Sequence, residues 1–335
     1  MIFGPQKPFV DLSIAGAPTG WLLGGALKEF TYRDVHHGEV DEITFKLADG
    51  SGLWRGGWGI DEGTEVSGLM GYAGLLGAKV PCGLYTVGET EAQGDGGGDT
   101  AIFHAQAAFT SKELRTERSE AFEQMELAAV IQKGADRHGL EVVGDIPDLR
   151  FERLSQEKQS DLNFWTRLAE DWGCYFSVKG SQLVFTSRES IEDMPAIRHF
   201  ELISGDRATR YSLRKSTHKL YAKAEAKYLH PKTKKLLKAE IEDDRVPSGD
   251  TLKLDDRAET QAHAERQATA RLARENDGLG TGKITVVGDP LLVAGQVVQL
   301  GLTYGKYAGR WLVTAARHRF NASGYTTTIN IKVLK

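Results

Sequence analysis

The 335-residue chain contains 42 basic and 46 acidic residues, so its formal net charge is −4, and 40% of its residues are hydrophobic. This composition is close to that of an average globular protein and far from that of a disordered or membrane chain. A negative overall charge gives no field that would gather phosphates, so sequence-independent DNA binding is disfavoured. The length predicts two or three domains.

No segment of the sequence has the pattern of an export signal or a membrane span. Residues 1–12 lack a basic stretch followed by an apolar run, and no run of about 18 apolar residues occurs. Cys82 and Cys174 lie far apart in different kinds of segment, which predicts two free thiols in a reducing compartment. We therefore expect a protein made in a cytoplasm, without membrane insertion.

The first third of the chain has the pattern of short β-strands. Every second side chain between residues 41 and 47 is apolar, which is typical of a strand with one buried face. Similar patterns occur at Phe9–Ile14, Leu27–Tyr32, Glu65–Tyr72, Leu84–Glu89 and Ala101–Phe109. Short strands separated by glycine-rich turns predict a barrel or a sandwich.

Two glycine-rich features of this region allow more than one interpretation. The run Ala92–Asp99 predicts a flexible loop inside the first domain, because consecutive glycines favour neither helix nor strand. Trp21, Trp54 and Trp58 could form a ligand site, but cores and subunit interfaces use the same residues. We expect at least two of the three tryptophans in a core or an interface.

The middle third changes to a helical period. Apolar residues recur at helical spacing between residues 119 and 138, and Gly139 is expected to end that helix in a left-handed conformation. A second helix is clearer, because the segment 160–173 begins with a serine that can cap it and ends with a glycine. A hairpin follows at 175–185. These elements predict a small α/β domain.

The last third returns to strands. Residues 220–228 and 236–241 predict a long hairpin with its turn at 230–233, and an alanine-rich helix follows at about 257–275. Four more strands are predicted at Gly282–Val287, Gln296–Leu302, Arg310–His318 and Tyr325–Val333. A second barrel-like domain is the natural interpretation.

Three motifs suggest chemistry but favour a structural explanation. The segment 280–283 lacks the first glycine and the hydroxyl residue of a phosphate loop, so we interpret it as a turn before a strand. The pair His36–His37 would point to opposite sides of an extended segment, and we expect a surface turn rather than a metal site. His318 lies near aromatic residues in a strand, where a hydrogen-bonded structural role is expected.

The charged clusters also favour structural explanations. The acidic groups at 61–62 and 240–244 could supply a carboxylate pair for glycoside hydrolysis, but nothing fixes the required separation, so we expect solvated loops. The lysines of the segment 232–238 precede acidic residues and predict a solvated hairpin tip that could contact a partner protein. We predict no catalytic, cofactor-binding or metal-binding residue, no cofactor, and no enzyme activity.

The order of segments from residue 140 onward resembles a known family. Phe151–Gly173 and the hairpin ending at Leu183–Phe185 resemble the central signature of the phage late control protein D family. The 228–235 hairpin, Val293–Val298 and Trp311–Thr327 are similar to that family in the same order. Members are tail hub proteins of contractile phages and phage-tail-like bacteriocins, related to the hub part of type VI spike proteins.

This resemblance implies a fold and an assembly. The expected fold is mainly β with α+β, in which two tail-tube-like antiparallel β-barrel domains flank a small α/β domain. The expected limits are 1–110 for the first barrel, 111–200 for the middle domain and 201–335 for the second barrel, with a helical insertion at about 257–275. Three subunits would form a ring that adapts the hexameric tail tube to the trimeric spike and encloses an axial channel.

The resemblance also implies the partners and the location. We expect a homotrimer that contacts the spike protein, the tail tube or tube-initiator protein, baseplate wedge proteins and the tape-measure protein. DNA would be transient cargo in a mildly acidic channel. The location would be the baseplate of a virion tail or a phage-tail-like particle, assembled in the bacterial host cytoplasm.

The alternative is a hub-associated cell-wall hydrolase. A transcription regulator would need a basic recognition helix, which the amphipathic middle helices do not resemble.

Overall fold

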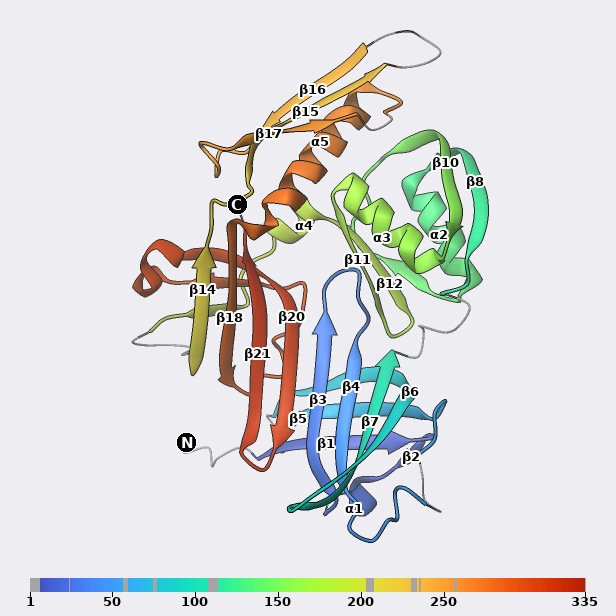
Figure 1. Cartoon of the computed structure of the whole chain (residues 1–335), viewed down its shortest axis with the longest axis vertical. Coiled ribbons are helices and arrows are strands. Elements are labelled where there is room, and N and C mark those ends of the chain that lie inside the picture. Colours follow the sequence, from blue (N-terminus) through green and yellow to red (C-terminus); the bar gives the residue numbers. More distant parts are fainter. Residues whose placement is uncertain are drawn as a thin grey trace.

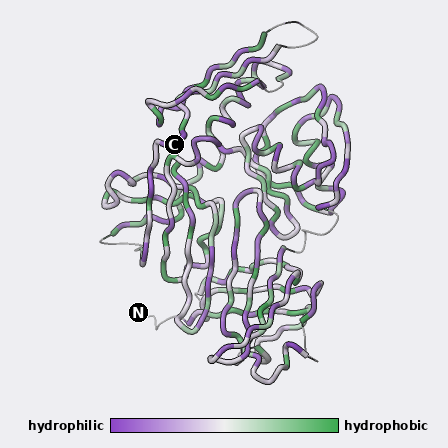
Figure 2. The backbone as a smooth tube through the Cα atoms, in the orientation of Figure 1, coloured by the Kyte–Doolittle hydropathy of each residue, from purple (hydrophilic) through white to green (hydrophobic). Residues whose placement is uncertain are grey.

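A computed structural model of the chain describes residues 7–23, 25–56, 60–74, 77–107, 114–202, 208–229, 234, 236–255 and 258–334. Most strands join one 13-stranded sheet, which runs in the order β14-β18-β21-β20-β3-β4-β7-β6-β5-β1-β2, with β19 and β13 attached beside β20. Hydrophobic and hydrophilic positions alternate along its long strands (Figure 2). The protein is therefore mainly β, as the sequence predicts.

The N-terminal strands form one part of this sheet (Figure 1). They are β1 (Pro8–Ile14), β2 (Ala17–Pro18), β3 (Leu27–Val35), β4 (Glu42–Ala48), β5 (Glu65–Tyr72), β6 (Lys79–Asp95) and β7 (Gly98–Ala107), with the short helix α1 (Gly20–Leu23). Alternate residues of β4, namely Ile43, Phe45 and Leu47, are fully buried. The predicted alternation at 41–47 is confirmed.

The C-terminal strands extend the same sheet. They are β13 (Arg198–Phe200), β14 (Arg210–Lys215), β18 (Gly280–Val287), β19 (Val297–Leu300), β20 (Gly309–Asn321) and β21 (Gly324–Val333), with the 3-10 helices η1 (Asn276–Leu279) and η2 (Leu302–Tyr307). Every second side chain of β21 from Tyr325 to Ile331 is buried. Cys82 and Cys174 are free, as predicted, and both are buried.

The prediction of barrels needs correction. Within the described residues neither group of strands closes on itself, because β3 and β20 pair antiparallel and join the two groups into one sheet. Phe30 lies opposite Phe320 in this pairing, with ring centroids 6.1 Å apart. Phe320 and Tyr325 from the C-terminal strands also complete the hydrophobic core of the N-terminal strands. Sequence periodicity does not show which distant strands pair, so it could not show this junction.

The middle of the chain forms a separate group of small sheets and helices. Its elements are β8 (Arg118–Glu126), α2 (Leu127–Arg137), β9 (Glu141–Val143), β10 (Arg150–Gln159), α3 (Asp161–Trp172), β11 (Cys174–Lys179), β12 (Gln182–Ser187) and α4 (Arg188–Glu192). Ser160 accepts a hydrogen bond from the backbone N–H of Asn163, and Gly173 ends α3 with φ 68°. Both ends of the predicted second helix are confirmed.

The first predicted helix of this region is wrong over its first half. Residues Arg118–Glu126 form β8, which pairs antiparallel with β10, and helix α2 begins only at Leu127. Phe122 is buried in the strand and stacks on Phe164 of α3 at 5.7 Å. The unpaired backbone of β10 supplies a partner for β8, and this tertiary contact outweighs the local helical spacing.

A last group of strands carries the alanine-rich helix. It contains β15 (Tyr221–Leu229), β16 (Leu236–Glu242), β17 (Asp250–Leu254) and α5 (Gln261–Glu275), which Thr260 caps by accepting from the backbone N–H of His263. The buried alanines Ala264 and Ala268 let α5 pack closely on β15 and β16. The predicted hairpin strands are confirmed, whereas the residues of the predicted turn lie outside the described part.

Two predicted turns are strands in the structure. The hairpin of β6 and β7 extends to Asp95 and Gly98, so the predicted flexible loop is reduced to the turn at Gly96–Gly97. Asp95 accepts a hydrogen bond from the N–H of Gly97 at 2.7 Å, which stabilises the turn. The segment 280–283 is the beginning of β18. In both cases the paired neighbouring strand outweighs the local preference of glycine for turns.

Candidate functional site

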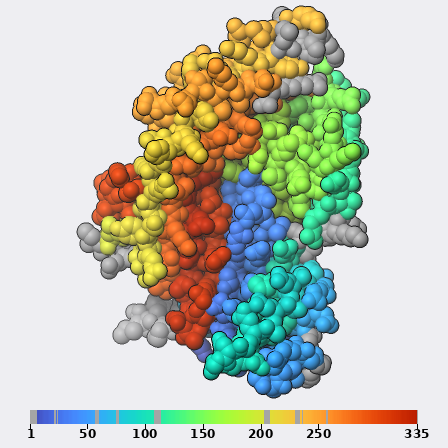
Figure 3. Space-filling view, in the orientation of Figure 1, coloured from blue at the N-terminus to red at the C-terminus, as the bar shows by residue number. Residues whose placement is uncertain are grey.

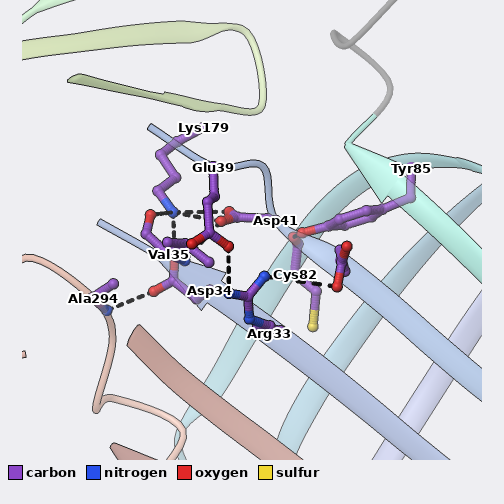
Figure 4. A network of polar contacts seen from close by, with 10 residues as sticks. Arg33, Asp34, Val35, Glu39, Asp41, Cys82, Tyr85, Lys179 and Ala294 are labelled. Carbon is purple, nitrogen blue, oxygen red and sulfur yellow. Dashed lines mark hydrogen bonds and ion pairs between the residues drawn. The ribbon is translucent and has the colours of Figure 1, made fainter. Parts of the chain in front are cut away.

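Three parts of the chain meet at one buried polar cluster, the Lys179 junction, which consists of Lys179, Asp34, Asp41 and the backbone of Val35 and Ala294 (Figure 4). The N-terminal segment lies between the C-terminal strands and the middle group of elements in the space-filling view (Figure 3). Asp34 lies near the end of β3, Asp41 directly precedes β4, and Lys179 ends β11. The junction therefore connects the N-terminal strands, the middle group and the loop before β19.

The ammonium group of Lys179 is the centre of this cluster. It donates to the carbonyl oxygen of Val35 at 2.7 Å and to the two carboxylate oxygens of Asp41 at 2.7 and 2.9 Å, and it also donates to Asp34. Asp34 accepts from the N–H of Ala294 at 2.6 Å, and Asp41 accepts from the N–H of Val35 at 2.9 Å. Each buried charge thus has several partners, as a stable buried ion pair requires.

Burial and charge set the protonation of the junction. Burial raises the pKa of Asp41 to about 6, with a further contribution from Asp34, although Lys179 acts in the opposite direction. Burial by itself would lower the pKa of Lys179, but the carboxylates of Asp34 and Asp41 outweigh it, so that pKa is raised. The lysine therefore stays charged, and Asp41 is the group that titrates near neutral pH.

A second contact between the same parts lies beside the junction. His36 is buried against Tyr175 of β11, with ring centroids 4.2 Å apart. The N–H of Phe176 donates to Nδ1 of His37 at 3.1 Å, and the N–H of Gly38 donates back to the carbonyl of Phe176 at 3.2 Å. The pair lies in the predicted turn, between β3 and β4, but the predicted surface location is wrong for His36, because β11 covers it. Burial lowers the pKa of His36 to about 3.

A cavity of about 410 Å³ opens next to these histidines. Lys332 of β21 and Arg188 of α4 both pair with Asp277, and both cations lie over the ring of Tyr175, at 5.0 and 5.2 Å from its centroid. Burial and the charge of Arg188 lower the pKa of Lys332 to about 8. The cavity is lined by paired charges that link α4, η1 and β21, which is an arrangement that holds elements together.

The arrangement resembles a structural joint more than a catalytic centre. His318 of β20 is fully buried and contacts the hydroxyl of Tyr325 at 2.8 Å and the carbonyl of Leu292 at 3.0 Å, so its predicted hydrogen bonding is confirmed. Burial lowers its pKa to about 4. Over the described ranges, no group of three or more His, Cys, Asp or Glu is placed to hold a metal ion.

The other residues considered from sequence fall in separate places. Trp54 is buried in the N-terminal core, whereas the side chain of Trp21 and all of Trp58 lie outside the description. In the acidic segment 240–244, Asp243 is buried and pairs with Arg245, so this part of the expected solvated loop is a structural contact. Of the lysine run, Lys238 is exposed and two members lie outside the described residues.

No motif in the sequence marks the Lys179 junction. Its charged residues are far apart along the chain, and none belongs to a motif. A polar residue near the end of an apolar strand pattern, such as Asp34, is the one signal present, and it is common in exposed loops. None of the helices within the described ranges is both long and apolar enough to cross a bilayer.

Comparison with known proteins identifies the family. The family model "Phage tail baseplate hub (GPD)" matches residues 77–324, which is most of the chain and contains Lys179 and the strands β18 to β20. The chain belongs to the phage tail baseplate hub family. It is also 29% identical to the "Probable baseplate hub protein" of Escherichia phage P2 over 168 residues, a match that covers 49% of this chain and 41% of the P2 protein.

Solved structures share the fold of this hub-family chain. A 43 kDa tail protein of prophage MuSo2 from Shewanella oneidensis superposes with a TM-score of 0.74 at 13% identity, covering 97% of this chain and 98% of that one. A tail protein from Neisseria meningitidis has a TM-score of 0.71 at 14% identity, covering 97% and 96%. An Escherichia coli component of the type VI secretion system has a TM-score of 0.57 at 11% identity, covering 92% and 74%.

These comparisons agree with the family resemblance found in the sequence. The matched family and the P2 relative are both described as baseplate hub proteins. They associate this chain with the baseplate of a phage tail. The similarity to solved structures, at under 25% identity, concerns the fold alone.

Proposed function

We propose that the protein is the tail hub of a contractile injection system, a homotrimeric ring that joins the hexameric tail tube to the trimeric spike and encloses the axial channel. The family match over residues 77–324 carries this proposal. The continuous sheet also supports the proposal. It contains strands from both the N-terminal and the C-terminal parts of the chain, so backbone hydrogen bonds between strands join these two parts. The proposed partners are the spike, the tube or tube-initiator protein, the wedge proteins and the tape-measure protein.

The Lys179 junction has a mechanical role in this proposal. A ring subunit that carries a spike must keep its parts in fixed orientation while the tail contracts. Buried, multiply hydrogen-bonded charges allow few alternative arrangements, because each displaced charge would be left unpaired in a low-dielectric region. The junction therefore fixes the middle group against the N-terminal strands.

The proposed domain limits remain 1–110, 111–200 and 201–335. Three hydrophobic clusters, centred on the N-terminal strands, the middle group and the C-terminal strands, support them, although Phe320 and Tyr325 of the C-terminal strands belong to the first cluster. Assembly in the host cytoplasm and passage of DNA as transient cargo belong to the same proposal. The two buried free cysteines are compatible with synthesis in a reducing compartment.

Light scattering of the purified protein, alone and mixed with the spike and tube proteins encoded beside it, tests the proposal. A trimer, or a monomer that becomes three copies on the spike, is the expected result. A monomer that binds neither partner would contradict the hub. In that case a cell-wall hydrolysis assay would test the alternative of a hub-associated hydrolase.

A further inference from the structure

One open face of the sheet carries a concentration of positive charge. A groove of about 580 Å³ runs across strands β14, β18, β21, β20 and β3. Its lining includes five cations, Arg33, Arg210, Lys283, Arg317 and Arg319, and one carboxylate, Glu29. Five cations and one carboxylate give the lining of the groove a formal charge of +4, although the whole chain has a formal charge of −4. We refer to this groove as the basic face.

Strand register places these side chains in rows across the sheet. Arg33 lies opposite Arg317, Arg317 opposite Thr328, Thr328 opposite Thr285, and Thr285 opposite Arg210. The row crosses five adjacent strands, which at about 4.8 Å between strands is roughly 19 Å. The row therefore has two arginines at one end and one arginine at the other, with two threonine hydroxyl groups between them.

The cations differ in whether they are already paired. Arg33 pairs with Glu39 and Glu42, and Nε of Arg319 donates to Glu29 at 3.0 Å. No carboxylate among the described residues forms an ion pair with the exposed side chains of Arg210, Lys283 or Arg317. These three cations can therefore bind an external anion most favourably, because no existing ion pair has to be broken first.

The chemistry of the basic face fits phosphate better than a protein surface. Arginine and lysine with threonine hydroxyls between them are the groups that contact nucleic-acid backbones. Protein interfaces need an apolar centre, whereas this lining is dominated by charged and hydroxyl side chains, with Tyr211 its one aromatic residue. The face therefore matches a polyanion that is contacted through its charge.

We infer that the basic face is a sequence-independent binding site for the phosphate backbone of nucleic acid. The site lies within one subunit, so it does not depend on ring formation, and it adds a direct contact to the proposed passage of DNA as cargo. It departs from the expectation from overall charge, which disfavoured such binding, because local charge and not the total sets the field at a surface. It also argues against an acidic lining wherever this face meets the channel.

Fluorescence anisotropy with a labelled duplex DNA of arbitrary sequence tests the inference. The wild-type protein is expected to bind with an affinity that falls as salt rises, with a slope of log K against log salt of about −2 to −3 for two or three phosphate contacts. Combined substitution of Arg210→Gln, Lys283→Gln and Arg317→Gln is expected to weaken binding at least tenfold and to flatten this slope. A scrambled duplex should bind equally well.

A matched control separates the basic face from net charge. Arg150→Gln, Lys238→Gln and Lys253→Gln remove the same three charges from exposed positions on other elements and are expected to leave the affinity almost unchanged. Circular dichroism verifies that both triple variants fold. Equal effects of the two triple variants, or the absence of salt-dependent binding by the wild-type protein, would overturn the inference.

Competition distinguishes nucleic acid from an acidic protein partner. At equal concentration of negative charge, unlabelled DNA is expected to displace the labelled probe far more effectively than polyglutamate does. More effective displacement by polyglutamate would instead identify an acidic polypeptide as the ligand of the basic face. Light scattering with the spike protein is run on the same variants. Loss of DNA binding with an intact hub assembly supports the inference, whereas loss of assembly with intact DNA binding would count against the proposed function alone.

Discussion

The Lys179 junction and the basic face use the same kinds of side chain in opposite ways. At the junction one ammonium group satisfies two buried carboxylates and a backbone carbonyl (Figure 4). On the basic face, Arg210, Lys283 and Arg317 are exposed and form no ion pair with a carboxylate among the described residues. The difference indicates that paired buried charges hold the parts of the subunit together, whereas unpaired exposed charges are available to something outside it.

Removing Lys179 is the strongest test of this comparison. Lys179→Met leaves Asp34 and Asp41 buried without their cation, and we expect the free energy of unfolding to fall by about 2–4 kcal/mol, with a discount because the lysine side chain is 28% exposed. Chemical denaturation measures the loss. Adding Asp41→Asn to this variant should recover part of it, since one uncompensated charge is then removed. A loss below about 0.5 kcal/mol would show that the junction does not stabilise the fold.

The pH dependence of Asp41 sharpens the account of the junction. Its folded-state pKa of about 6 exceeds the ordinary value of 3.8, so the folded chain binds more protons between these values. The stabilisation from this proton is present below pH 4 and is lost as pH rises through 6. We expect wild type to lose up to about 2 kcal/mol relative to Asp41→Asn over this range.

Comparison with the variant at each pH is needed, because buried histidines act in the opposite direction. The lowered pKa values of His36 and His318 favour the folded state above pH 6.5 and remove that stability as pH falls. Both proteins carry these histidines, so their contribution cancels in the difference. A difference that does not change between pH 4 and 6 would contradict the raised pKa of Asp41.

The cap of helix α3 gives a smaller effect within the middle group. Ser160→Ala removes the oxygen that accepts from the N–H of Asn163 at 3.2 Å, and we expect a loss of about 1 kcal/mol in unfolding free energy. Thermal denaturation is the measurement. Ser160→Asp, which can still accept this hydrogen bond, is the control and should keep most of the stability. Equal losses in the two variants would assign the effect to something other than capping.

The basic face should have the smallest effect on stability. Arg317→Gln removes an exposed charge that has no ion pair among the described residues. We therefore expect the free energy of unfolding, measured by chemical denaturation, to change by less than about 0.5 kcal/mol. Arg319→Gln, whose arginine pairs with Glu29, is the matched comparison and should cost slightly more. A large loss for Arg317 would mean that its charge has an internal structural role.

Local patterns in the sequence predicted local structure well. The alternation in β21, the serine cap and terminal glycine of α3 and the strands of the long hairpin all depend on neighbours within a few residues. The helix expected from residue 119 failed because β10 offered a strand partner that local periodicity does not reveal. Family resemblance, rather than composition, identified the hub fold class.

Long-range contacts explain what the sequence did not predict. The pairing of β3 with β20, which replaces two closed barrels by one sheet, joins opposite ends of the chain. The Lys179 junction likewise depends on Asp34 and Lys179 being brought together by the fold. The basic face was missed because its cations are single residues on separate strands, so they form no charged run and are balanced in the total charge.

A cryo-electron microscopy reconstruction of the tail particle that carries this protein would test the central claim most directly. We expect three copies of the chain in a ring between the tail tube and the spike, each with Lys179 in contact with Asp34 and Asp41. Copies in another number, or a position outside the path from tube to spike, would contradict the hub assignment.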